Sequence, residues 1–301
     1  MRRGVLYGVA AYLFWGLFPL FWPLLEPADA GEILAHRMVW SLVVMSVVVT
    51  VARQWSTIRR MAGRTWLLVV AAALLISVNW GVYIFAVNSG QVIDAALGYF
   101  INPLVSVLMG VLIFRERLHP LQWAAVALGG TAVVVIGIAG GTFPWIAVVL
   151  AASFGLYGLV KKVIPLPPPA SLTAEGVVLV APALAFLAYR QVDGTSTLTG
   201  HGTWHVLLLV LSGVITVLPL LAFAASARAL PLSILGLLQY LTPVMQFVLG
   251  VTALHETMMP ARWIGFVLVW AALMLLSAQG LRQARATVRS RGSATGAAGA
   301  S

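Results

Sequence analysis

The sequence contains no cysteine and few charged residues. Charged side chains make up 9% of its 301 residues, and hydrophobic side chains make up 61%. The absence of thiols excludes disulfides, thiolate metal sites and a cysteine nucleophile. A soluble domain carries about 25% charged residues, so this chain has too few to cover a surface that faces water. Lipid, against which side chains need no charge, is the solvent that this composition predicts.

Local motifs of catalysis and cofactor binding are also missing. The sequence has no G-x-x-x-x-G-K-[ST] phosphate loop, no H-E-x-x-H zinc motif and no G-x-S-x-G nucleophile motif. We therefore expect no enzyme, no metal and no cofactor. The net charge of +10 would suggest nucleic acid as the partner of a soluble protein. Here the basic residues stand between apolar runs, which indicates orientation in a membrane instead.

Ten apolar runs separated by polar breaks predict ten transmembrane helices, because a spanning helix needs about 20 mostly apolar residues. The first run, from Gly4 to Leu25, is longer than the apolar core of a signal peptide and is expected to remain in the protein. Residues 281–301 are expected to form a disordered cytoplasmic tail. The predicted spans are 4–25, 33–51, 66–87, 94–114, 121–138, 144–161, 172–190, 204–226, 233–254 and 262–280.

The basic residues predict the orientation of these spans. Cytoplasmic loops of membrane proteins carry an excess of Lys and Arg. With both termini in the cytoplasm, only Arg37, Arg190 and Arg262 fall on the outer side. We therefore predict a multi-pass protein of the bacterial inner membrane with both ends inside. The residues on the cytoplasmic side are then Arg2, Arg3, Arg53, Arg59, Arg60, Arg64, Arg115, Arg117, Lys161, Lys162, Arg228, Arg282, Arg285, Arg289 and Arg291.

The chain repeats itself at a shift of 140 residues. This shift places Pro103 on Pro243 and Glu116 on Glu256. Proline and charged positions seldom coincide by chance, so we interpret 4–138 and 144–280 as two copies of a five-helix unit. The further matches are Gly110 with Gly250, Pro120 with Pro260 and Trp123 with Trp263.

Five is an odd number, so the second copy must enter the membrane from the opposite side. Inverted repeats of this kind are the architecture of many secondary transporters. We therefore predict a permease that moves a small organic solute by alternating access. The alternatives are a non-transporting membrane scaffold or sensor, in which the duplication only builds a stable bundle, and a membrane-embedded enzyme. Neither the identity of the solute nor the oligomeric state follows from these residues.

Three stretches carry a more specific pattern, namely Glu32-Ile-Leu-Ala-His36-Arg37, Asn79-Trp80 and Ala96-Leu-Gly98-Tyr99-Phe100-Ile-Asn102-Pro103-Leu. They resemble the RarD branch of the EamA transporters, within the drug/metabolite transporter superfamily. The resemblance runs from about Gly4 to Ser277. It implies a ten-helix permease without an ATPase domain, and it implies little about the cargo.

Polar and aromatic side chains within the spans are candidates for a solute cavity, since polar groups in a membrane are costly. Packing is the competing interpretation, because aromatic and small residues also line contacts between helices. Every fourth residue from Gly98 forms one small and polar stripe, and the same positions of the second copy form its equivalent. The two stripes are Gly98, Asn102, Ser106 and Gly110, and Leu238, Thr242, Gln246 and Gly250. The cavity candidates are Trp15, Asn79, Trp80, Tyr83, Tyr99, Asn102, Tyr157, Gln239 and Tyr240.

Three charged residues are candidates for ion coupling or ion pairing. Arg37 and Asp94 both fall at the outer ends of their spans, and we hypothesise that they pair. The competing hypothesis makes Asp94, or Glu175, a carboxyl that carries a coupled proton. Glu175 lies near the inner start of its span, with Lys161 or Lys162 as the expected partner. Glu116 and Glu256 recur in both copies on opposite faces, which favours capping of helix ends.

Overall fold

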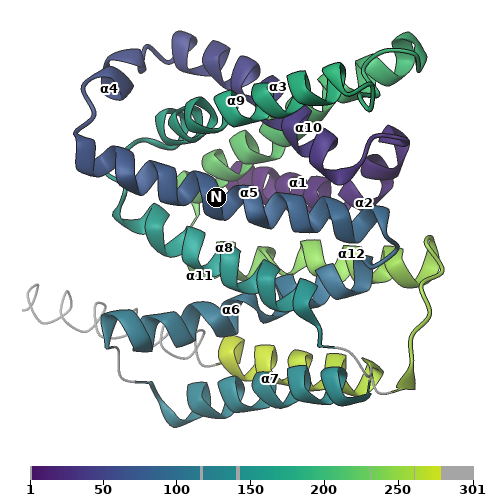
Figure 1. The fold of residues 1–301 in the computed structure, drawn as a ribbon. Coiled ribbons are helices and arrows are strands. Elements are labelled where there is room, and N and C mark those ends of the chain that lie inside the picture. The colour runs from purple at the N-terminus through teal and green to yellow at the C-terminus, as the bar shows by residue number, and fades with distance from the viewer. Residues whose placement is uncertain (1, 116–117, 140–142, 231, 261, 279–301) are drawn as a thin grey trace, which may run out of the picture.

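The protein is helical throughout the residues that its computed structural model describes, which are 2–115, 118–139, 143–230, 232–260 and 262–278. The helices run roughly side by side across Figure 1, from α3 and α9 at the top to α7 at the bottom. No strand occurs among these described residues. The all-α class predicted from the sequence is therefore confirmed. The predicted tail lies outside the described residues.

Among the described residues, eight helical segments are long and apolar enough to cross a membrane. One of them, Ile234–Thr252, comprises most of α11 and all of α12, which are separated by a turn at Gln239 and Tyr240. The helices concerned are α3 (Ala30–Val51), α5 (Gly63–Asn88), α6 (Val92–Phe114), α7 (Pro120–Ala139), α8 (Trp145–Val163), α9 (Pro168–Val192), α10 (Gly202–Ala229), α11 (Leu232–Leu238) and α12 (Leu241–Thr252).

The two ends of the chain carry shorter pieces. The first predicted span is broken into α1 (Arg2–Gly16), α2 (Phe18–Phe21) and the 3-10 helix η1 (Trp22–Leu25). The bend at this break is 42°, and counting the bent pair as one span brings the total to nine. Arg262–Ala278 is a shorter apolar helix. The small helix α4 (Trp55–Arg59) was not predicted.

The start of α6 is capped by a residue from far along the chain. Glu256 accepts hydrogen bonds from the backbone amides of Val92, at 2.6 Å, and Ile93, at 2.9 Å. These amides have no partner within the helix, and a carboxylate also suits the positive end of the helix dipole. Burial raises the pKa of Glu256, while the two amides oppose this shift. The predicted capping role of Glu256 is confirmed, and that of Glu116 lies outside the described residues.

Most of the larger contacts between the helices have a counterpart when the two predicted halves are exchanged, although the contact of α3 with α5 has none of similar extent. This exchange maps α1 onto α8, α3 onto α9, α5 onto α10, and α6 onto α11 and α12. The contact of α6 with α8 then corresponds to the contact of α12 with α1. The contact of α1 with α10 corresponds to that of α8 with α5, and the contact of α3 with α10 corresponds to that of α9 with α5. The contacts of α3 with α9 and of α6 with α12 map onto themselves.

Glycines allow several of these helices to approach closely. A side chain at Gly213 of α10 would collide with the backbone of Trp40 on α3. A Cβ at Gly250 would lie 2.7 Å from Ile93 Cγ1, which supports the packing interpretation of this glycine. Small residues serve this purpose in membrane proteins, where close backbone contact replaces the hydrophobic effect.

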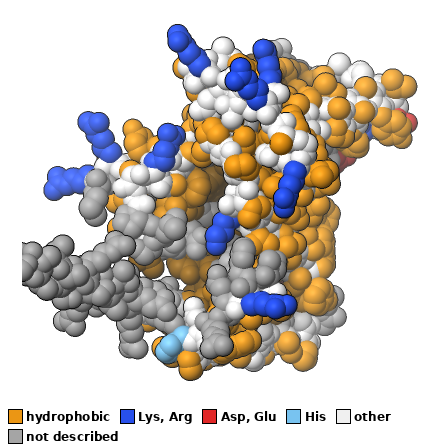
Figure 2. Space-filling model, turned by 90° about the vertical axis from the view of Figure 1, so that its left-hand side faces the viewer, with side chains coloured by type: hydrophobic (Ala, Val, Ile, Leu, Met, Phe, Trp, Pro, Cys, Tyr) orange, Lys and Arg blue, Asp and Glu red, His pale blue; other side chains and the backbone are white. Residues whose placement is uncertain are grey.

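Opposite ends of the bundle differ in charge. Figure 2 shows Lys and Arg gathered on the end that lies at the left of Figure 1. We call this the basic end. The described basic residues on the chain segments that meet there are Arg2, Arg3, Arg53, Arg59, Arg60, Arg64, Arg115, Lys161, Lys162 and Arg228. The opposite end holds Arg37, Arg190 and Arg262 together with Glu26, Asp29, Glu32, Asp94, Asp193 and Glu256.

Candidate functional site between the two halves

A network of side-chain amides and tyrosines joins α5 to α6 and α8 inside the bundle. Asn79, which is 1% exposed, donates from Nδ2 to the Leu150 carbonyl and to Ser153 Oγ, both at 3.0 Å. Its Oδ1 accepts from the Tyr99 hydroxyl at 3.2 Å. Tyr99 and Tyr83 place their ring centroids 5.7 Å apart. These groups satisfy one another, so Asn79 fixes the contact between α5 and α8.

A second hydrogen-bonded contact inside the bundle uses Gln246 on α12. Its Nε2 donates to the Tyr83 hydroxyl at 2.8 Å and to the Trp15 carbonyl at 3.3 Å. The Trp15 carbonyl lies just before the break at Leu17 that separates α1 from α2. Gln246 therefore ties α5, from the first half of the chain, to α12 from the second half.

Arg37 lies on α3 and is 2% exposed. Its Nε donates to Thr216 Oγ1 at 2.7 Å. Its Cζ stands 3.9 Å from the ring centroid of Trp80 and 5.1 Å from that of Trp22. Its Nη1 has no hydrogen-bond partner. Among the described residues, no carboxylate forms an ion pair with Arg37.

A cavity of about 40 Å³ lies between α3, α5, α9 and α10. Trp80 and Thr216, which both contact Arg37, line it, and so does Glu175. The rest of the lining is mainly apolar. It comprises Met38, Ser41, Leu42, Met45, Ile76, Leu172, Gly176, Leu179, Val217 and Leu220.

Glu175 is the centre of a polar group toward the basic end, which we call the Glu175 cluster. Its Oε1 accepts from Lys161 Nζ at 2.6 Å and from Ser171 Oγ at 3.0 Å. Its Oε2 accepts from the Tyr157 hydroxyl at 3.1 Å. The predicted pairing of Glu175 with a neighbouring lysine is confirmed, and Lys161 is the partner. The cluster ties α8 to α9 beside the cavity.

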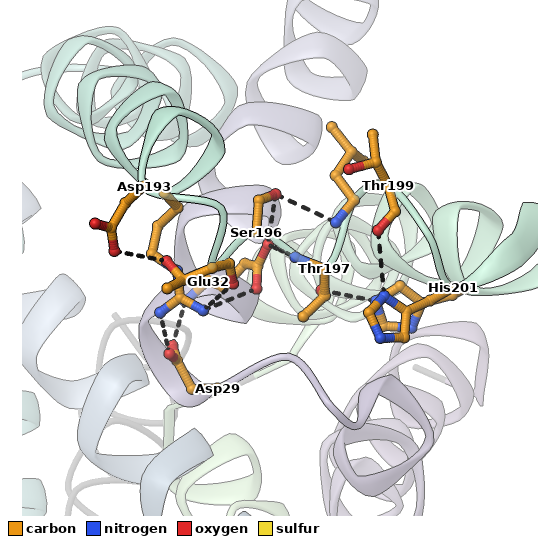
Figure 3. Close-up of polar contacts among 11 residues, drawn as sticks. Asp29, Glu32, Asp193, Ser196, Thr197, Thr199 and His201 are labelled. Carbon is orange, nitrogen blue, oxygen red and sulfur yellow. Dashed lines mark hydrogen bonds and ion pairs between the residues drawn. The ribbon is translucent and has the colours of Figure 1, made fainter.

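Glu32 is the centre of a second polar group, at the opposite end, which we call the Glu32 cluster. Figure 3 shows Asp29 and Glu32 facing the loop that carries Ser196 and Thr197. Glu32 is 0% exposed, and its Oε1 accepts from the Thr197 amide at 2.8 Å and from Ser196 Oγ at 3.1 Å. Its Oε2 lies 3.4 Å from Arg190 Nη2. The cluster joins α3 to the end of α9 and to the loop before α10.

Asp29 completes the Glu32 cluster at its edge. It accepts from the Glu32 amide at 2.9 Å, which caps the start of α3, and it forms an ion pair with Arg190. Burial raises the pKa of Asp29, but the amide of Glu32 and the charge of Arg190 outweigh it, so the net pKa is lowered. Arg190 therefore has two carboxylates as partners.

The predicted pairing of Arg37 with Asp94 is wrong. Asp94 pairs instead with Arg262, at 3.4 Å between carboxylate oxygen and guanidinium nitrogen. The prediction placed both residues at one depth but had no information on which helices are neighbours. Arg37 faces Thr216 of α10, whereas Asp94 faces the start of the last apolar helix, where Arg262 stands.

The remaining cavity candidates fall into different surroundings. Tyr240 packs against the apolar cluster around Phe100 and Phe247, and it shares no recorded contact with Asn79. Gln239 is half-buried at the turn between α11 and α12. Asn102 is buried, with an Oδ1 that has no partner. The structure thus brings together Trp15, Asn79, Tyr83 and Tyr99, but it does not join Gln239 and Tyr240 to them.

Sequence reasoning missed Glu32 and Thr216 as site residues. Glu32 was placed in a loop because the span was predicted to begin at residue 33, whereas α3 begins at Ala30. Thr216 carries no charge and resembles any other small residue in a long apolar helix. An N-cap pattern, with Asp29 three residues before Glu32, was the available signal for the earlier start.

The described residues hold no group of three or more His, Asp or Glu side chains suited to a metal ion. Comparison with known proteins decides the family. The sequence model of the EamA-like transporter family matches twice, over residues 2–138 and 143–278. The chain belongs to the EamA-like transporter family. It is accordingly a multi-pass membrane protein of a transporter family.

Relatives within the EamA-like family cover nearly the whole chain. Protein RarD of Streptomyces exfoliatus is 52% identical, over 94% of this chain and 91% of its own length. The uncharacterized transporter YojE of Bacillus subtilis (strain 168) is 41% identical, over 95% of this chain and 97% of its own. One crystal structure matches with a TM-score of 0.61 at 19% identity, over 94% of this chain and 99% of that one, which shows a shared fold.

Proposed function

We propose that this chain is a secondary transporter that moves a small organic solute by alternating access between two inverted five-helix halves. The observation that carries this proposal is the pattern of helix contacts, in which pairs within and between the halves have counterparts after exchange. Two copies that can adopt each other's conformation interchange inward-open and outward-open states. The two matches of one family sequence model support the same division.

The proposal places ten crossings in the membrane. Eight long helices, the bent pair at the start and the shorter helix Arg262–Ala278 supply them. An even number of crossings puts both termini on one side. The concentration of Lys and Arg at the basic end supports the cytoplasm of a bacterium as that side.

The two glutamate clusters are suited to act as gates. The Glu32 cluster joins α3 to α9 at the end that the proposal places outside. The Glu175 cluster joins α8 to α9 beside the cavity, toward the basic end. Each is a set of charge-assisted hydrogen bonds between elements that must separate if its end of the bundle opens. Opening at one end while the other remains closed is the two-state change that transport requires.

The proposal is tested by measuring solute flux through a protein whose Glu32 cluster can be held closed by a chemical cross-link. The native chain has no cysteine, so Glu32→Cys with Thr197→Cys introduces the only thiols. Proteoliposomes loaded with a mixed extract of small metabolites should lose one or more solutes when they contain the native chain, and also when they contain this variant. A short bifunctional thiol reagent should stop that loss, and reduction of a cleavable reagent should restore it. Vesicles that lose no solute beyond protein-free controls would contradict the proposal, with the native chain as the matched control for both cysteines.

A further inference from the structure

Arg37 is a buried cation to which no described residue brings a counter-charge. The other two arginines at this end have carboxylate partners, Arg190 in Asp29 and Glu32, and Arg262 in Asp94. Arg37 is the most buried of the three, yet its recorded partners are one hydroxyl and three aromatic rings. Burial of a charge is costly unless the charge is paired and hydrogen-bonded, so this arrangement calls for an anion.

Donor groups without acceptors cluster around this guanidinium. Arg37 Nη1 has no partner, and neither has the indole Nε1 of Trp22, whose ring centroid is 5.1 Å from Arg37 Cζ. Both groups can only donate hydrogen bonds. Trp22 is fully buried, so water does not replace the missing acceptor at the surface. An acceptor that carries negative charge would satisfy both donors at once.

We infer that Arg37 and Trp22 form the head-group site for the solute, and that the solute is an organic monocarboxylate with an apolar body. One guanidinium offers a planar fork that matches the two oxygens of a carboxylate and balances a single negative charge. The rings of Phe18, Trp22 and Trp80 surround the same position with apolar surface. The cavity next to Trp80 and Thr216 is lined mainly by Met, Leu, Ile and Val, an apolar lining that matches the body of the solute. At about 40 Å³ it must widen to admit a ring.

This inference takes its biological role from the proposed transport function, but binding alone is enough to test it. Benzoate is the first probe, because it combines one carboxylate with a flat apolar ring. Acetate tests the head group without the body, phosphate tests another oxyanion, and chloride at equal ionic strength is the control salt. The readout is the thermal unfolding midpoint of the full-length protein in nanodiscs of neutral lipid.

Benzoate should raise the unfolding midpoint of the native chain above its value in chloride, and more than acetate or phosphate does. Arg37→Gln should weaken the binding of benzoate by at least about tenfold, the equivalent of one lost charge-assisted hydrogen bond. Arg37→Lys, which keeps the charge but not the fork, should lose part of the affinity. Trp22→Phe keeps the ring and removes the free donor, and it should also weaken binding.

Arg262→Gln is the matched control, because it removes a guanidinium that already has a carboxylate partner and lies outside both glutamate clusters. It should leave the affinity for benzoate unchanged. Equal protection by chloride and benzoate in the native chain would overturn the inference, as would full benzoate protection in Arg37→Gln. Nanodiscs of anionic lipid provide a further arm. If they abolish benzoate protection of the native chain, the site holds a lipid head group, and the assignment to a solute is overturned.

Measurements of solute flux distinguish a failure of this inference from a failure of the proposed transport function. If benzoate binds at Arg37 but proteoliposomes move no solute, the anion site remains and the transport proposal fails. If a neutral solute is moved at the same rate by the native chain and by Arg37→Lys, transport stands and the assignment of the solute class is overturned.

Discussion

Arg190 and Arg37 lie at the same end of the bundle, and the structure treats their charges in opposite ways. Arg190 lies between Asp29 and Glu32, and it also donates to the Thr195 carbonyl at 2.7 Å. Arg37 faces rings and a hydroxyl and has no carboxylate partner among the described residues. One nitrogen of each guanidinium, Nη1 of Arg37 and Nε of Arg190, has no hydrogen-bond partner there, so the carboxylates make the difference. A cation with carboxylate partners holds elements together, whereas a cation without them is available for an anion. Four substitution experiments test this contrast.

The largest effect is expected at the shared carboxylate of the Glu32 cluster. Glu32→Ala removes the acceptor of the Thr197 amide and the fully buried partner of Arg190. Breaking a buried ion pair on one side costs about 3–5 kcal/mol, so the free energy of unfolding should fall by about that amount. Denaturation of the purified protein in detergent measures it. A variant as stable as the native chain would show that the cluster does not hold this end together.

The contrast between the two arginines is sharpest when both are replaced by the same residue. Arg190→Met leaves Glu32 buried without its cation and should cost about 1–3 kcal/mol. Arg37→Met removes a buried charge that has no partner, at the expense of ring contacts, and should stay within about 1 kcal/mol of the native chain. Thermal unfolding of both variants and the native chain under the same conditions measures the two losses of stability. An equal or greater loss in Arg37→Met would make Arg37 a structural residue.

A smaller effect is expected for the ion pair between Asp94 and Arg262, which the structure has in place of the predicted pair between Arg37 and Asp94. Asp94 and Arg262 are partly exposed, with side chains 11% and 25% accessible, so their pair should contribute about 0.2–1 kcal/mol. Asp94→Arg combined with Arg262→Asp should recover part of the stability that either change removes. The same swap between Asp94 and Arg37 should recover none. Recovery in the second swap would return Arg37 to the role of a structural partner.

The smallest effect concerns pH and Asp29. Its pKa is lowered in the folded protein, so its contribution to stability is complete above the usual carboxyl pKa and is lost as the pH falls through the lowered value. The side chain of Asp29 is 52% accessible, which screens the effect. Asp29→Asn should make the unfolding midpoint slightly less dependent on pH in the acid range. An unchanged pH profile would show that Arg190 relies on Glu32 alone.

The sequence predicted the helices well because the membrane imposes their length and composition. Each predicted span overlaps a helical segment of the structure, although the first is broken at Leu17 and the ninth contains a turn at Gln239 and Tyr240. Hydropathy averages over many residues, so it does not detect a break of one or two. The helix α4 was missed because a helix of five residues has too few positions to show a period.

The site was predicted less completely, because neighbours in space do not follow from depth in the membrane. Pairing of Glu175 with Lys161 was predictable, since both residues flank one short connection between sequential helices. Pairing of Asp94 with Arg262 was not, since 168 residues separate them along the chain. The contact between Arg37 and Thr216 could not be predicted for the same reason, because 179 residues separate them along the chain.

The most direct test of alternating access measures distances between helices at both ends of the bundle. Spin labels on cysteines at Glu26 and Thr199 report the end with the Glu32 cluster, and labels at Arg59 and Val163 report the basic end. All four positions are exposed in a chain without native cysteine. When Glu32→Gln weakens the first cluster, the account predicts a longer distance between 26 and 199 and an unchanged distance between 59 and 163, where the Glu175 cluster stays closed. Two distances that both stay fixed, or that lengthen together, would contradict it.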